Sequence, residues 1–161
     1  MSVGYLAAGD SWVAGSTTFL CLHPPEGFSA KEANAYSECF LVRFGAGSGQ
    51  ESTLLLTGDV QEDGEKALLR ELETRGIGGI TVLKAAHHGS KNSTPSELLE
   101  QLSPLVTVIS SGRNNRYGHP HAELMERLEE CGTYILQTAQ SGAVTITFRG
   151  DRTEVSLMWG E

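Results

Sequence analysis

Three short apolar segments along the chain each end abruptly in polar residues. Residues 53–57 (Thr-Leu-Leu-Leu-Thr) run into Gly58 and Asp59, and residues 80–86 run into a pair of histidines. Residues 105–109 (Leu-Val-Thr-Val-Ile) run into a loop rich in Ser, Asn and Arg. Apolar runs of this length, bounded by turn residues, are typical of buried strands. We therefore predict three strands, each with polar side chains at its carboxyl end.

Segments with helical periodicity separate these strands. Leucines recur on one face of residues 60–75, and a second apolar stripe follows Thr-Pro-Ser-Glu at 94–97, which fits a capping box at a helix start. A third helix is predicted from Pro120 to about Cys131. Strands that alternate with helices are most simply parallel, with right-handed crossovers. The polar clusters are then expected along one edge of the sheet, where open α/β sheets bind ligands.

The flanking regions are predicted to be mainly β. Residues 18–22 read as a strand stopped by His23 and two prolines, and His23 itself is interpreted as a turn residue. Residues 36–44 are expected to pair with the strand at 53–57 as a hairpin. Further strands are predicted at 134–137, 143–148 and 153–159, and Trp12 and Trp159 are interpreted as packing residues. With no repeat or linker, residues 1–161 are predicted to form a single α/β domain.

Charge and hydropathy narrow the classes of function. The net charge of −8 argues against binding of nucleic acid by a basic surface alone, because such binding needs Lys and Arg to displace counterions. A nucleic-acid substrate held at a metal site is not excluded, since a bound divalent ion reverses the local field. No apolar run is long enough to span a bilayer. Cys21, Cys39 and Cys131 are far apart in sequence and are expected to be free thiols.

Asp59 is the first candidate for chemistry. It follows an apolar strand and a glycine, a position from which a carboxylate could ligate or bridge metal, although the residues alone favour the structural alternative. The alternative is structural: Asp59-Val60-Gln61-Glu62 also fits a capping box, in which the aspartate caps the next helix.

The segment His87-His88-Gly89-Ser90 is the second candidate. Neutral imidazole is the commonest metal ligand in proteins, and a strand end holds it rigidly. The alternative is a buried histidine whose ring is satisfied by backbone groups, with Gly89 making the turn. Two adjacent histidines at a strand end leave ligand or acid/base work and a structural role about equally favoured.

Residues 114–121 (Asn-Asn-Arg-Tyr-Gly-His-Pro-His) form the third candidate. His119 and His121 stand at the predicted start of a helix, where free N–H groups favour an anion such as phosphate. Arg116 could add a bidentate contact. The alternative is a polar loop whose asparagines make turns. The number of side chains in this segment that are able to bind a ligand or take part in catalysis favours a site.

Together the three motifs, residues 55–59, 83–90 and 114–121, resemble a known family. They are similar to the metallo-β-lactamase-like domain of the ComEC family, the DNA-internalisation competence proteins. The likeness runs from about Gly9 to the end of the chain, and Asn34 and Ser37 fit the family pattern ahead of its central strand. The implied fold is the C-terminal half of a metallo-β-lactamase-type αβ/βα sandwich, with a mixed β-sheet flanked by helices.

The resemblance also implies roles for individual residues. Asp59 matches the metal-bridging aspartate of the family, and His87 is the preferred match to its last metal-ligand histidine. Direct roles in catalysis are implied for Asp59, His88, His119 and His121. Contacts with substrate or its phosphate are implied for Ser90, Asn115, Arg116 and Tyr117. The implied cofactor of the complete domain is a divalent metal, Zn or Mn, that activates water for hydrolysis of a phosphodiester.

One departure from the family pattern bears on activity. The His-x-His-x-Asp-His motif, which supplies most of the metal ligands in the family, is absent. Zinc sites normally need three or four protein ligands, and this chain matches about two. We therefore predict little or no tight metal binding and no activity for the chain alone. A half-sandwich is also expected to expose an apolar face, and thus to self-associate as a homo-oligomer.

The resemblance implies partners and a location for the complete protein. Single-stranded DNA is the implied substrate, and the activity proposed for the family is degradation of the strand that is not imported. The other half-domain and a membrane channel domain are implied partners, with this domain on the outer face of the cell membrane. Two alternatives stay open: a hydrolase of the same fold that acts on a phosphoester or lactone, and a non-catalytic structural or interaction domain with a vestigial site.

Overall fold

The computed structural model describes residues 4–45, 51–149 and 152–159. Short 3-10 turns at Ala33–Tyr36 and Ala86–Gly89 interrupt the main elements. The strands and helices are β1 (Ser11–Ala14), β2 (Thr17–His23), β3 (Cys39–Phe44), β4 (Ser52–Leu56), α1 (Asp63–Arg75), β5 (Val82–Lys84), α2 (Ser96–Leu102), β6 (Val106–Ile109), α3 (Ala122–Cys131), β7 (Tyr134–Gln137), α4 (Thr138–Ser141), β8 (Val144–Arg149) and β9 (Arg152–Leu157).

Seven strands form one mixed sheet in sequence order, from β1 to β7. The first four are joined as antiparallel hairpins, and β4 to β7 run parallel. The predicted α/β class and the parallel order of the three central strands are thus confirmed. The carboxyl ends of β4, β5 and β6 meet at one edge of the sheet, as expected for parallel neighbours.

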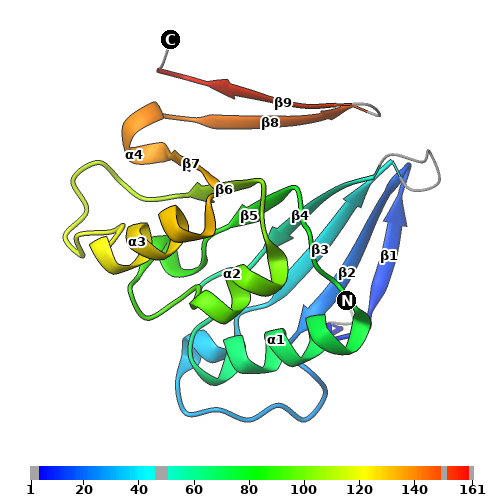
Figure 1. The fold of residues 1–161 in the computed structure, drawn as a ribbon. Helices are drawn as coiled ribbons and strands as arrows, with labels where there is room; N and C mark the ends of the chain where they lie inside the picture. The colour runs from blue at the N-terminus through cyan, green and yellow to red at the C-terminus, as the bar shows by residue number, and fades with distance from the viewer. Residues whose placement is uncertain (1–3, 46–50, 150–151, 160–161) are drawn as a thin grey trace.

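The main core lies between the sheet and helices α1, α2 and α3, which cover the same face (Figure 1). Alternate strand residues point to this face because side chains in a strand alternate sides. The sheet contributes Leu41, Leu55, Leu83 and Ile109, and the helices contribute Leu68, Leu72, Leu98, Leu102, Leu124 and Leu128, all of them buried. Burying one leucine side chain stabilises the fold by about 2 kcal/mol. This layer of leucines is therefore the main source of stability.

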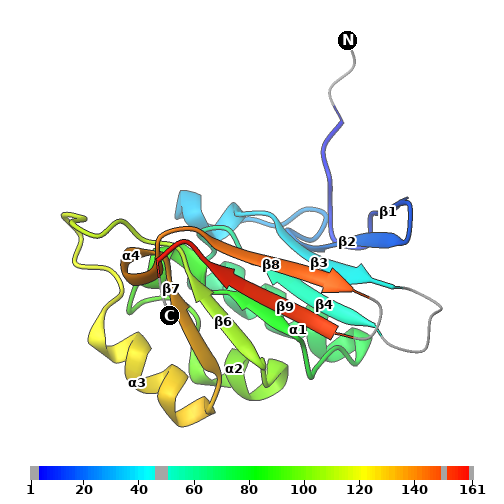
Figure 2. The same ribbon diagram turned by 90° about the horizontal axis from the view of Figure 1, so that it is seen from above.

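The opposite face of the sheet is covered in part by the hairpin of β8 and β9 (Figures 1 and 2). Phe44 of β3 stacks on Phe148 of β8, with ring centroids 4.1 Å apart. A groove of about 560 Å³ remains between the sheet and the hairpin. Its walls are mainly apolar and include Leu54, Leu56, Val82, Val108 and Ile146. Self-association through this face stays a prediction.

Several local expectations are corrected by tertiary contacts. The capping box at 94–97 is wrong: α2 begins at Ser96, and the Thr94 hydroxyl instead accepts a hydrogen bond from the backbone N–H of Ala86 at 3.1 Å. Helix α1 begins at Asp63 rather than at residue 60. The short helix α4 was not expected. Among the described residues, none of the helices combines the length and apolar character that crossing a bilayer requires.

Candidate functional site

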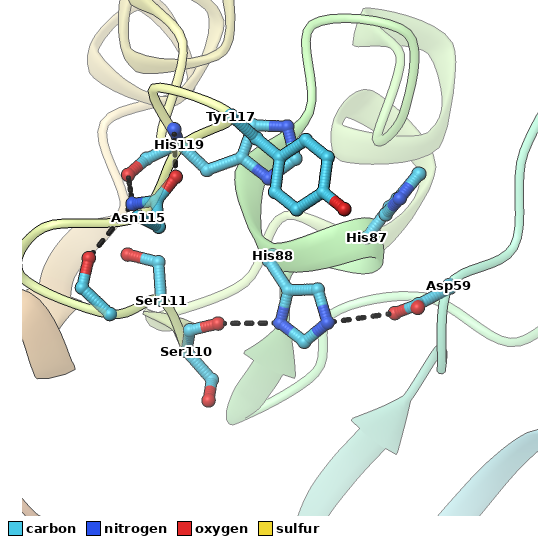
Figure 3. A pocket seen from close by; sticks show the side chains of 9 residues that line it. Asp59, His87, His88, Ser110, Ser111, Asn115, Tyr117 and His119 are labelled. Atoms are coloured by element: carbon cyan, nitrogen blue, oxygen red, sulfur yellow. Dashed lines mark hydrogen bonds and ion pairs between the residues drawn. The ribbon is translucent and has the colours of Figure 1, made fainter.

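A pocket of about 690 Å³ opens at the carboxyl ends of β4, β5 and β6. It collects residues from all three polar clusters that the sequence placed there (Figure 3). Its lining consists of Asp59, His87, His88, Ser110, Ser111, Gly112, Asn115, Tyr117 and His119. The expected convergence at this edge of the sheet is therefore observed.

Asp59 enters the pocket from the turn that follows β4. Gly58 adopts a left-handed conformation with φ of 54°, and the Asp59 N–H donates to the Ser37 hydroxyl at 3.2 Å. Lys84 holds the same turn, because its ammonium group donates to the Gly58 carbonyl at 3.0 Å. The capping alternative for Asp59 is wrong, since the N-cap position of α1 is Glu62. The Asp59 carboxylate therefore does not cap α1, and its side chain is 39% exposed.

The histidine pair lies on a strained turn directly after β5. His87 and His88 both have positive φ, 45° and 56°, a conformation that is uncommon for residues other than glycine. The His88 Nδ1–H donates to the Ser110 carbonyl at 2.7 Å, so a neutral ring carries its lone pair on Nε2. That nitrogen lies 3.5 Å from Oδ1 of Asp59 (Figure 3).

The ring of His87 differs from that of His88 in its hydrogen bonding. Its Nδ1 is buried and has no hydrogen-bond partner among the described residues. A buried polar atom without a partner is costly unless a ligand or water completes it. The alternative of a histidine satisfied by backbone groups thus fits one nitrogen of His88 and does not fit His87. Both rings remain candidates for ligand or acid/base work.

The loop from Ser110 to His121 closes the pocket on the other side. Asn115 makes a turn, as the structural alternative proposed: its amide donates to the carbonyls of Gly112 at 2.8 Å and His119 at 2.7 Å. It nevertheless lines the pocket. His119 packs edge-on to His87 with ring centroids 5.7 Å apart. Burial, followed by the nearby histidines, lowers the pKa of His119, which favours the neutral ring at pH 7.

Three predicted site residues lie outside the lining of this pocket. Ser90 is 5% exposed, and its hydroxyl contacts the Gln61 amide at 3.4 Å. His121 is the N-cap residue of α3, and its Nδ1 accepts a hydrogen bond from the Lys91 N–H at 3.0 Å. Arg116 lies over the Tyr117 ring at 4.9 Å from the centroid. Their roles with substrate stay predictions.

Two serines that sequence reasoning did not single out also line the pocket. The carbonyl of Ser110 orients His88, and the Ser111 hydroxyl is buried without a hydrogen-bond partner among the described residues. Their signal was present, because both follow directly on the third predicted strand. Serine is so common in ordinary turns that the residue type alone did not distinguish them.

The residues present do not by themselves form a closed metal site. Within residues 4–45, 51–149 and 152–159, no group of three or more His, Cys, Asp or Glu side chains is placed to hold an ion. The donor groups in the pocket are the Asp59 carboxylate and the imidazoles of His87, His88 and His119. A carboxylate and imidazoles suit Zn or Mn in kind.

A hydrogen-bonded clamp of charged side chains holds the loop that follows the histidines. The Arg127 guanidinium of α3 donates to the backbone carbonyls of Lys91, Ser93 and Thr94, at 3.1, 2.8 and 3.2 Å. The Glu65 carboxylate of α1 accepts a hydrogen bond from the Thr94 N–H. Burial raises the pKa of Glu65 to about 7, despite these contacts. The clamp fixes the far end of the turn that carries His87.

Replacing Glu65 by Gln is expected to stabilise the protein at pH 8 and to change little at pH 5. The folded pKa is raised above the unfolded value, so the stability tied to the protonated carboxyl is present at low pH and is lost as pH rises through about 7. Gln keeps an acceptor for Thr94 and never ionises. We expect a gain of about 1–3 kcal/mol at pH 8, measured by urea unfolding at both pH values.

The exposed Glu73 of α1 provides the matched control, because Glu73→Gln removes the same charge from the surface. It should change the unfolding free energy by less than about 0.5 kcal/mol at either pH. Equal curves for wild type and Glu65→Gln at pH 8 would contradict the raised pKa.

Comparison with known proteins finds relatives among proteins of DNA transformation and recombination, while no protein-family model matches the chain. It is 38% identical over 151 residues to "Recombination protein 2" of Haemophilus influenzae, covering 94% of this chain and 18% of that protein. It is 37% identical over 95 residues to "ComE operon protein 3" of Bacillus subtilis, covering 59% of this chain and 12% of that protein. It is 31% identical over 137 residues to "Competence protein ComA" of Neisseria gonorrhoeae, covering 85% and 19%. The chain thus spans less than 20% of the length of each of these relatives.

Proposed function

Because this chain belongs to the ComEC family of competence proteins, we propose that it forms one wall of a phosphodiester-cleaving site in a protein that takes up DNA. The observation that carries the proposal is the meeting of Asp59, His87, His88 and His119 in one pocket. A carboxylate beside several imidazoles is a donor set suited to hydrolysis. The names of the relatives support DNA as the substrate.

The proposed roles follow from the contacts of each side chain. The hydrogen bond to Ser110 fixes the His88 ring, so its Nε2 is presented to the pocket as an acceptor beside Asp59. The lowered pKa of His119 favours a neutral ring, which accepts a proton or a hydrogen bond from water or substrate. Asn115 holds the backbone of His119 in place. Tyr117 is 62% exposed at the rim, where a substrate could contact it.

A divalent ion, Zn or Mn, is part of the proposal only for a complete domain. Asp59 and His87 or His88 would supply some of its ligands there, and residues outside this chain would supply the rest. When bound, such an ion lowers the pKa of a coordinated water and neutralises charge on the phosphate. The chain alone is proposed to be inactive.

The setting proposed for the complete protein is the cell membrane, with this domain on the outer face. Its partners there would be the other half-domain, a membrane channel domain and single-stranded DNA. Its task would be to degrade the DNA strand that is not imported.

The test uses a fusion in which the chain is preceded by the His-x-His-x-Asp-His half of a ComEC-family relative. We expect the fusion to cleave single-stranded DNA in the presence of Mn or Zn, and the chain alone to be inactive. Activity on a lactone but not on DNA would contradict the proposal in favour of another hydrolase. A folded fusion that cleaves neither would favour a non-catalytic domain.

A further inference from the structure

A second hollow lies beside the site pocket, across the Ser110–Gly112 segment. Its volume is about 480 Å³, and residues 110–112 line both hollows. The remaining wall comes from Arg113, from residues 138–143 around helix α4, and from Trp159. The two hollows therefore adjoin at this segment, and their linings together make up a surface that includes Asp59 in the first hollow and Trp159 in the second. The side chains proposed to act in the hydrolytic site line the first pocket and not the second hollow.

The indole of Trp159 is positioned firmly at the end of this surface. The backbone N–H of Trp159 donates a hydrogen bond to the Ser141 carbonyl at 2.8 Å. A Cβ on Gly142 would lie 3.0 Å from the indole Cε3, so the ring packs directly on the glycine backbone. The side chain nevertheless remains 51% exposed. The sequence-based interpretation of Trp159 as a packing residue thus accounts for only part of its surface.

Two arginines lie over aromatic rings on either side of the shared segment. The Arg113 guanidinium carbon is 4.8 Å from the centroid of Trp159, and that of Arg116 is 4.9 Å from the centroid of Tyr117. The Arg113 Nε–H also donates to the Ala139 carbonyl at 3.2 Å. Each pair sets a flat ring beside a fixed positive charge, which is the combination that single-stranded nucleic acids bind by base stacking and phosphate contact.

The charge of this surface differs from that of the molecule. The whole chain has a net charge of −8, yet residues 110–122 contain two arginines and no Asp or Glu. Residues 138–143 on the facing wall contain no Asp or Glu either. Of the residues that the structure describes, Asp59 is the one acidic residue lining either hollow. An anionic strand would meet local attraction here and repulsion over most of the remaining surface.

We propose that Arg113 and Trp159 form a nucleotide subsite that holds a base of a single-stranded nucleic acid next to the pocket of Asp59. The base stacks on the part of the indole that Arg113 and Gly142 leave exposed, and the Arg113 guanidinium contacts the adjoining phosphate. Tyr117 and Arg116 hold a second nucleotide at the opposite rim. This subsite rests on the proposed function, because it takes the strand to be the substrate of the same site.

Trp159 itself reports on the subsite, since the chain has only one other tryptophan. In the variant Trp12→Phe, Trp159 is the sole tryptophan, so all of the tryptophan fluorescence comes from it. We expect a single-stranded oligothymidylate to quench it saturably, because a stacked base quenches an indole. An abasic strand of the same length and charge should produce little quenching. Arg113→Gln and Tyr117→Ala should each weaken binding about tenfold, and the exposed Arg70→Gln on α1 should change it less than about twofold.

Two results would overturn the subsite: no saturable quenching by oligothymidylate, or equal quenching by the abasic strand. In the latter case the phosphates alone account for binding. A cleavage assay on the complete domain separates this inference from the proposed function. Quenching without cleavage keeps the subsite and removes the nuclease, and cleavage without quenching does the reverse. Far-ultraviolet circular dichroism of each variant confirms that the fold is retained.

Discussion

Replacing Asp59 by Asn is expected to reduce DNA cleavage by the complete domain at least about 10³-fold. Among the described residues, Asp59 is the one carboxylate that lines the pocket, and it does not cap α1. Within the same residues, its charged-group contact is with His88 at 3.5 Å, which is an ion pair only when the imidazole is protonated, and both side chains are half-exposed. Loss of that contact should change stability by less than about 1 kcal/mol. The substitution therefore separates chemistry from folding, and initial cleavage rates measure it.

Asp63→Asn provides the matched control. Asp63 lies four residues further on, in the first turn of α1, and its carboxylate pairs with Lys66 at the surface, 3.0 Å away. It is the same change of charge outside the pocket, and it should leave the cleavage rate within about twofold. A complete domain that keeps its activity with Asn at position 59 would remove Asp59 from the mechanism.

Replacing Gly89 by Ala is expected to destabilise the chain by about 2–4 kcal/mol. Gly89 has φ of 92°, and a Cβ there would lie 2.8 Å from Cβ of Pro120 and 3.0 Å from Cγ2 of Ile109. Its carbonyl accepts the His121 N–H at 2.9 Å, so this contact joins the histidine turn to the loop that carries His119. Urea unfolding measures the loss of stability, and cleavage by the complete domain should fall with it.

Gly132→Ala distinguishes backbone strain from the clash. Gly132 is the left-handed C-cap of α3, with φ of 74°, and its Cβ would meet no atom within 4 Å. Only the conformational cost remains there, about 1 kcal/mol. Equal losses for the two variants would show that the close approach to Pro120 contributes nothing.

The three strands and the position of the site could be predicted because the signals are local. Each strand is a continuous apolar run with a polar end, and their alternation with helices fixes parallel order. Parallel order in turn places Asp59, His87 and the loop after Ile109 at one edge. This part of the site follows from topology and needs no side-chain geometry.

The remaining geometry depends on contacts between distant segments. The left-handed turn at His87 and His88 is held by Thr94, Ser110 and the clamp of Arg127, and none of these is adjacent in sequence. Thr94 carries the pattern of a helix cap but serves this turn instead, because its hydroxyl bonds Ala86. Local propensity gives no sign of such tertiary bonds.

The Arg113–Trp159 pair could not be foreseen for a related reason. The two residues are separated by helices α3 and α4, strand β7 and the hairpin of β8 and β9, and only the return of that hairpin over the sheet brings them together. Helix α4, which forms the wall between them, is four residues long and too short to show periodicity.

The most direct test is the divalent metal content of two purified proteins: this chain, and its fusion to a His-x-His-x-Asp-His half-domain. If the pocket is one wall of a metal-dependent site, the fusion should hold about one or two Zn or Mn ions per chain. The chain alone and the Asp59→Asn fusion should hold far less. Stoichiometric metal in the chain alone, or an unchanged content after Asp59→Asn, would contradict a site that Asp59 shares with residues outside the chain.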